Sequence, residues 1–132
     1  MRFMMMVPDG AAPDEKTMAR MMEYNRSLQK AGVLLAIDGL FPHSTGARVT
    51  FTDGKATVTD GPFAEAKEVI GGYWIIQVSS REEAIQWAMR APMSNKGIID
   101  VRQIAEMADM PEVFRKAMEG FEGPRSAAAP KA

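Results

Sequence analysis

The sequence contains no cysteine and only one histidine, His43. The absence of cysteine excludes disulfide bonds, thiolate metal ligands and cysteine nucleophiles, and it is typical of proteins in a reducing compartment. With one histidine, a multi-histidine metal site cannot form within one subunit, and a Ser-His-Asp triad would have to use this residue. The sequence also has no phosphate-binding glycine loop and no HExxH or EF-hand spacing. We therefore expect a cytoplasmic protein that needs no metal or cofactor.

The sequence also has neither an excess of one charge nor long apolar segments. The 16 Lys and Arg residues balance 17 Asp and Glu residues, and like charges do not form long runs. This pattern gives no electrostatic footprint for nucleic acid. Residues 1–7 are mostly apolar, but Pro8 ends this stretch. The stretch is too short for the apolar region of a signal peptide or for a membrane span. We expect one domain of 132 residues that binds neither nucleic acid nor a membrane.

Apolar periodicity and turn residues predict the order of the elements: strand, helix, strand, hairpin, strand, helix, strand and a final helix. The predicted strands cover residues 2–7, 33–37, 69–78 and 98–105, with 33–37 as a buried strand, and the hairpin covers 49–58. The first helix begins at Asp14, ends at Gly32 and packs through Met18, Met21, Met22 and Leu28; the second follows Ser79-Ser80, and the third is capped by Asp109 with Glu112.

The hairpin is the clearest local signal, because Asp53-Gly54 suits the positive φ angles of a two-residue type I′ turn. This turn pairs Phe51 with Ala56 and Val49 with Val58. These four apolar side chains are then expected to share one face of the hairpin.

Two helices separated by strands predict an α+β, ferredoxin-like split β-α-β fold, with an antiparallel sheet and helices on one face only. Residues 69–78 are apolar at both odd and even positions, so the second face also needs a cover. A second copy of the sheet is the simplest cover, which predicts a homodimer with a cavity between the sheets. The expected divisions are a domain at 1–107, an appended helix at 108–122 and a disordered tail at 123–132.

The most distinctive segment is Asp60-Gly61-Pro62-Phe63, which continues through residues 64–68 to Gly71-Gly72-Tyr73. It resembles the signature of the DGPF family within the YCII-related proteins, and flanking matches extend the resemblance over roughly residues 2–105. The resemblance implies a ferredoxin-like dimeric α+β barrel. It also implies that some relatives are associated with extracytoplasmic-function sigma factors. Relatives on the broader fold include lactone isomerases, dehydrochlorinases and small monooxygenases.

YCII-type relatives carry a His-Asp pair to which catalysis is attributed. The resemblance places its histidine in the first helix and its aspartate just before a proline after the second helix. Here the helix segment at 19–24 has no histidine, and the later position reads Ala91-Pro92. The pair is therefore absent, and any chemistry must use other residues.

Asp60 and His43 are the candidate catalytic residues. Asp60 lies at the end of a predicted strand beside Phe63, where partial desolvation would raise its pKa toward that of a general base. Histidine is the side chain whose ordinary pKa lies near neutrality, and His43 lies in a predicted loop, where sites often occur. The alternatives are that residues 60–63 form only a turn and that the histidine has no role in chemistry.

Five further residues are candidates for substrate binding: Arg102, Phe63, Tyr24, Tyr73 and Lys67. A guanidinium on a sheet face needs an anion or a carboxylate, so Arg102 would bind either a ligand or an internal partner such as Asp100, Glu65 or Glu68. The tyrosines would line the cavity or pack in the core, and Lys67 would orient an acid or face solvent.

Two hypotheses for function follow. The first is a protein that binds a small acidic or aromatic molecule in the dimer cavity. Acid–base chemistry of the isomerase or lyase kind is the reaction that would fit this site. The second is a non-catalytic regulatory module whose final helix binds a protein partner. The sequence leaves both open.

Overall fold

The computed structural model describes residues 1–10, 13–62 and 70–123. Its main sheet has four antiparallel strands in the order β2-β5-β1-β6, formed by β1 (Arg2–Pro8), β2 (Leu34–Gly39), β5 (Ile70–Gln77) and β6 (Asp100–Gln103). Strands β3 (Ala47–Thr52) and β4 (Lys55–Asp60) pair separately, and the helices are α1 (Glu15–Lys30), α2 (Arg81–Met89) and α3 (Glu112–Ala117). This arrangement confirms the predicted ferredoxin-like α+β fold.

Both long helices begin at the residues that the sequence indicates, and α1 also ends there. Asp14 caps α1 by accepting a hydrogen bond of 2.7 Å from the backbone N–H of Thr17. Gly32 follows that helix with a φ of +74°, the left-handed conformation that terminates helices. Ser80 caps α2 by accepting a hydrogen bond of 3.1 Å from the N–H of Glu83.

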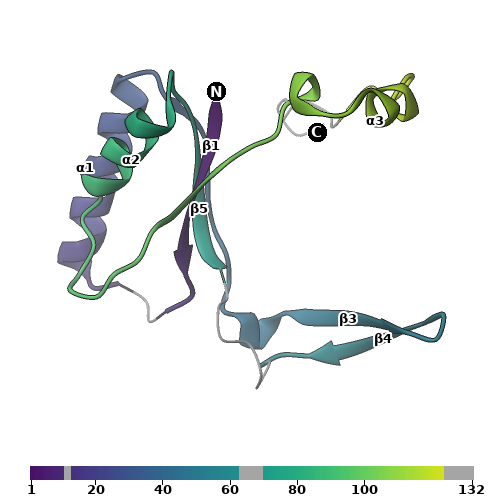
Figure 1. Ribbon diagram of the computed structural model, residues 1–132. Helices are drawn as coiled ribbons and strands as arrows, with labels where there is room; N and C mark the ends of the chain where they lie inside the picture. The colour runs from purple at the N-terminus through teal and green to yellow at the C-terminus, as the bar shows by residue number, and fades with distance from the viewer. Residues whose placement is uncertain (11–12, 63–69, 124–132) are drawn as a thin grey trace, which may run out of the picture.

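The hydrophobic core lies between the main sheet and helices α1 and α2 (Figure 1). Its buried members are Phe3, Met5, Tyr24, Leu28, Val33, Trp74, Ile76, Val78 and Ala84. The prediction that Met18 and Met22 pack inward is wrong, since 49% and 45% of their surfaces stay exposed. Tyr24 and Leu28, four residues apart, define the packed face of α1 instead.

Strand β2 lies at one edge of the sheet. The apolar run from Val33 to Ile37 was predicted to be a buried strand, but only Val33 is buried, and Leu35 and Ile37 are largely exposed. An apolar run of this length is compatible with both edge and central positions, because periodicity does not report how strands pair.

The hairpin formed by β3 and β4 has the predicted register. Phe51 pairs with Ala56 and Val49 with Val58. Every residue of both strands is exposed in the single chain, and Phe51 exposes 78% of its surface. The hairpin therefore leaves the domain with its apolar face uncovered.

Figure 1 shows α1 and α2 on one side of the sheet, whereas the hairpin and the segment containing α3 project from the other side. The predicted cap of α3 by Asp109 is wrong. Pro111 precedes α3 without a side-chain cap, and Asp109 instead accepts a hydrogen bond of 2.9 Å from the N–H of Glu106. The predicted tail, residues 123–132, lies outside the described residues apart from Gly123.

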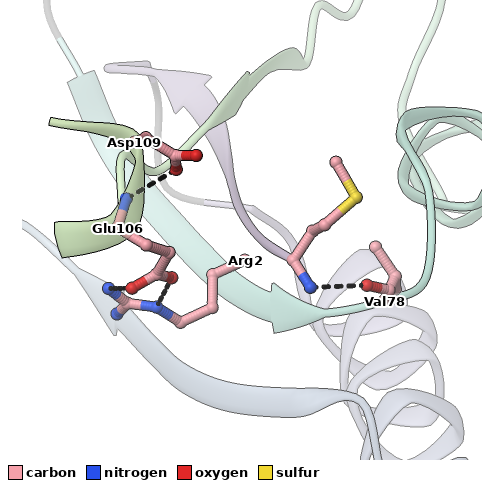
Figure 2. Close-up of polar contacts among 5 residues, drawn as sticks. Arg2, Val78, Glu106 and Asp109 are labelled. Atoms are coloured by element: carbon pink, nitrogen blue, oxygen red, sulfur yellow. Dashed lines mark hydrogen bonds and ion pairs between the residues drawn. The ribbon is translucent and has the colours of Figure 1, made fainter.

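The segment after β6 is anchored at the start of β1 (Figure 2). The Nε atom of Arg2 lies 2.6 Å from Glu106 Oε1, and its Nη2 atom lies 3.1 Å from Oε2. The N–H of Ile104 also donates to the carbonyl of Arg2 at 2.9 Å. These contacts fix the direction in which the C-terminal segment leaves the sheet.

This ion pair makes stability depend on pH. The hydrogen bond from Arg2 holds the pKa of Glu106 below its ordinary value of 4.5. A carboxyl group whose pKa is lowered by folding stabilises the protein above its unfolded pKa, and that stabilisation is lost as the pH falls through the folded pKa. We expect Glu106→Gln to lower the free energy of unfolding at neutral pH, by an amount that shrinks in acid.

Urea unfolding at several pH values from neutral to below 4.5 measures this difference. Glu119→Gln is a suitable control, because Glu119 is exposed and forms no ion pair with another described residue. A difference for Glu106→Gln that stays constant across the pH range would contradict the expectation.

Candidate functional site

His43 and Asp9 form a pair at one end of the main sheet. Asp9 directly follows β1, and His43 begins a short 3-10 helix, His43–Thr45, after β2. Asp9 Oδ2 accepts a hydrogen bond of 3.1 Å from the backbone N–H of His43 and lies 3.0 Å from its Nδ1 atom. Both side chains are partly buried, with 31% and 17% of the His43 and Asp9 side chains exposed.

This geometry orients the imidazole. The hydrogen bonds from the His43 side chain and backbone hold the pKa of the Asp9 carboxyl below its ordinary value. An ionised Asp9 can only accept a hydrogen bond, so Nδ1 of His43 is the donor and the neutral ring has its lone pair on Nε2. A histidine held in one tautomer by a carboxylate is an arrangement used in acid–base catalysis.

Gly61 of the distinctive segment packs against the His43 backbone. A Cβ atom at Gly61 would overlap the His43 carbonyl oxygen and would lie 3.2 Å from Ser44 Cα. The N–H of Gly61 donates to the Gly46 carbonyl at 2.9 Å. The glycine therefore allows the loop carrying His43 to approach the end of β4.

Asp60, the predicted general base, is the last residue of β4 and is exposed. Its neighbour Gly61 brings it to the same corner as His43, but the hydrogen-bonded carboxylate partner of His43 is Asp9. Phe63 and Lys67, both predicted to bind substrate, lie outside the described residues.

The sheet face opposite the helices carries two rungs of paired residues. Residues Ala36, Ile75, Met4 and Arg102 form one rung, and Asp38, Tyr73, Met6 and Asp100 form the other. Their neighbours Phe3, Met5, Trp74 and Ile76 are buried on the helix side, and side chains alternate along a strand. We call this surface the open sheet face. Met4, Met6 and Ile75 make its middle largely apolar, and Asp38, Asp100 and Arg102 place charged groups at its edges.

Tyr73 and Arg102 both lie on the open sheet face. The Tyr73 hydroxyl donates a hydrogen bond of 2.6 Å to Asp38 Oδ2, which raises the pKa of the phenol. Arg102 is exposed, and no ion pair joins it to Asp100 or to any other described carboxylate. Of the internal partners predicted for Arg102, Glu65 and Glu68 lie outside the described residues.

Tyr24 lies elsewhere, in the helix layer. It is buried in α1 and donates a hydrogen bond of 2.7 Å to the carbonyl of Trp87. It lines a cavity together with Arg20, Glu23, Ser27, Arg90 and Pro92. The cavity therefore lies between the helix segment at 19–24 and Pro92.

Asp9 and Asp38 are functional candidates that were not predicted from the sequence. Strands β1 and β2 both run antiparallel to β5, so they are parallel to each other and end at the same edge of the sheet. Asp9 follows the first strand, and Asp38 lies next to the end of the second. Carboxylates at the ends of two parallel strands are the signal that would have indicated this site.

The described residues contain no group of three His, Cys, Asp or Glu side chains arranged to hold a metal ion. No helix in the same part of the chain is long and apolar enough to cross a membrane.

Comparisons with known proteins support the family resemblance indicated by the segment at 60–73. The family model described as the YCII-related domain matches residues 1–108. An uncharacterised protein of Rhizobium meliloti (strain 1021) is 33% identical over 94 residues, which cover 70% of this chain and 76% of the relative. These matches confirm the resemblance predicted from the sequence.

Proposed function

The chain belongs to the YCII-related family, and from that premise and the geometry of its sheet we propose that it is a cytoplasmic homodimer that binds a small acidic or aromatic molecule. The observation that carries this proposal is the open sheet face. It offers an apolar middle around Met4 and Ile75, with Arg102 at one edge and the Asp38–Tyr73 pair at the other. Apolar surfaces with a few convergent polar groups are typical of ligand sites.

A second copy is the proposed cover for this face. The hairpin and the α3 segment project on the same side and expose large apolar side chains, including Phe51 and Phe121 at 78% and 66%. Large apolar side chains that stay exposed on one side of a protomer indicate an interface. A twofold dimer that closes the open sheet faces against each other would cover the sheet and both projections.

His43 and Asp9 supply the proposed chemistry. Asp9 holds the ring so that Nε2 exchanges a proton with the bound molecule, and Asp60 is a second carboxylate at the same corner. Arg102 would hold a developing oxyanion on the ligand. Abstraction and return of a proton, as in an isomerase or lyase, is the reaction class that these groups support without a metal.

Light scattering and a thermal-shift screen of small carboxylates and aromatic compounds test the proposal. We expect a dimer and a ligand that raises the melting temperature, because binding only the folded state stabilises it. In folded dimers, Asp9→Asn and His43→Ala should each reduce the shift caused by that ligand. Asp53→Asn at the hairpin tip is the control, since asparagine suits its positive φ angle of 50°.

Two results would contradict the proposal. A monomer at micromolar concentration would show that no cavity forms between two subunits. A full ligand-induced shift of the melting temperature in both folded variants would show that the His43–Asp9 pair does not contribute to ligand binding.

The second candidate function is a regulatory module that binds an extracytoplasmic-function sigma factor. The observation that favours it is α3, on which Val113 exposes 78% of its surface and Phe114 47%. The same thermal-shift measurement distinguishes the two: a purified sigma factor would raise the melting temperature, whereas no small molecule in the screen would.

A further inference from the structure

A cavity of about 260 Å³ opens in the helix layer. One wall is formed by α1 residues with the spacing i, i+3, i+4 and i+7, namely Arg20, Glu23, Tyr24 and Ser27. The other wall is formed by Arg90 and Pro92, which follow α2. Residues at this helical spacing lie on one face, so the cavity is a consequence of how α1 packs beside α2.

The guanidinium groups of Arg20 and Arg90 both line this cavity. The Arg90 guanidinium carbon lies 4.6 Å from the centre of a Trp87 ring, so stacking on the indole restrains it. Neither Arg20 nor Arg90 forms an ion pair with any carboxylate of the described residues. Both groups therefore keep hydrogen-bond donors for an anion.

The remaining lining residues favour a ligand with one negative charge. Glu23 offsets one of the two arginines and leaves a single positive charge in the cavity. Burial raises the pKa of Tyr24 to about 12, so its phenol stays neutral. Its hydroxyl bridges to the Trp87 carbonyl and joins the two walls, which makes the site rigid on its aromatic side.

We propose that this cavity binds a small organic monocarboxylate with a planar aromatic body, held through Arg20 and Arg90. The guanidinium fork matches a carboxylate geometrically, and the ring of Tyr24 together with Pro92 supplies apolar surface. The site lies in the helix layer, separate from the open sheet face, and does not require a dimer.

Benzoate is a suitable probe, with benzamide as its neutral counterpart of the same shape. In a titration followed by amide NMR, we expect benzoate to shift signals of residues 20–27 and 87–92 and benzamide to bind much more weakly. Arg20→Gln and Arg90→Gln should each raise the dissociation constant about tenfold, the loss expected for one charge-assisted hydrogen bond. Arg26→Gln, an exposed arginine of the same helix that does not line the cavity, should leave it unchanged.

The outcomes separate this site from the proposed dimer cavity. Benzoate affinity that falls in Arg102→Gln but not in Arg20→Gln would place the carboxylate on the open sheet face and overturn the inference. Equal binding of benzamide, equal losses in Arg26→Gln, or no shifts at millimolar benzoate would overturn it as well. Retention of benzoate binding in His43→Ala is expected, whether or not the dimer proposal holds.

Discussion

Leu28→Ala is expected to lower the free energy of unfolding by about 2 to 5 kcal/mol, the range for truncating a fully buried leucine. Leu28 has no exposed surface and lies in the core between α1 and the sheet. Alanine is the best helix former, so the substitution does not weaken α1 itself. The loss would come from removed apolar contacts and from the cavity left beside residues such as Tyr24 and Ile76.

Met18→Ala in the same helix is the matched control. About half of the Met18 side chain is exposed, and the substitution brings the same gain in helix propensity, so we expect a change below about 1 kcal/mol. Urea unfolding at one fixed protein concentration measures both variants, because dimerisation would make stability depend on concentration. Equal losses for the two variants would mean that the packed face of α1 includes Met18, as its apolar spacing first indicated.

The parts of the fold that the sequence predicts correctly depend on local chemistry. Asp53-Gly54 fixes the hairpin register because its turn type allows only one pairing. Asp14 and Gly32 bound α1 because capping involves residues close in the chain. The order of elements then leaves few ways to arrange the sheet.

The errors arise where distant parts of the chain decide the structure. Glu106, Asp109 and Glu112 are spaced three apart, so the sequence allows a cap at either Glu106 or Asp109. Arg2 binds Glu106 from the other end of the chain, and Asp109 then caps the turn that follows it. The spacing of residues 106–112 gives no information about the contact between Arg2 and Glu106.

The candidate site was also predictable only where it depends on local sequence. His43 is identifiable as the only imidazole, but its partner Asp9 is 34 residues away and reads as part of a turn in Pro8-Asp9-Gly10. The pair forms because β1 and β2 end at the same edge of the sheet. Asp60 was the more prominent carboxylate in the sequence, yet the carboxylate that accepts the hydrogen bond from the His43 backbone and lies against its ring is Asp9.

Gly61→Ala is expected to lower the free energy of unfolding by about 1 to 3 kcal/mol, as for other overpacked sites. The added methyl group would overlap the His43 carbonyl oxygen and crowd its carbonyl carbon at 3.0 Å. Both are backbone atoms, so no side-chain rotation relieves the overlap, and either the loop at 43–45 or the end of β4 must move. Movement of the loop would weaken the hydrogen bonds from His43 to Asp9.

Gly39→Ala is the control for this substitution, because a Cβ atom at Gly39 meets nothing within 4 Å and its φ angle is not positive. Urea unfolding compares the stabilities, and NMR titration of the Asp9 carboxyl reports on the pair. Since hydrogen bonds from His43 lower the pKa of Asp9, their loss in Gly61→Ala should move that pKa up toward its ordinary value, while Gly39→Ala leaves it lowered. If Gly61→Ala is as stable as Gly39→Ala and keeps the lowered pKa, the glycine of the signature does not position His43, and a role for residues 60–63 must be sought elsewhere.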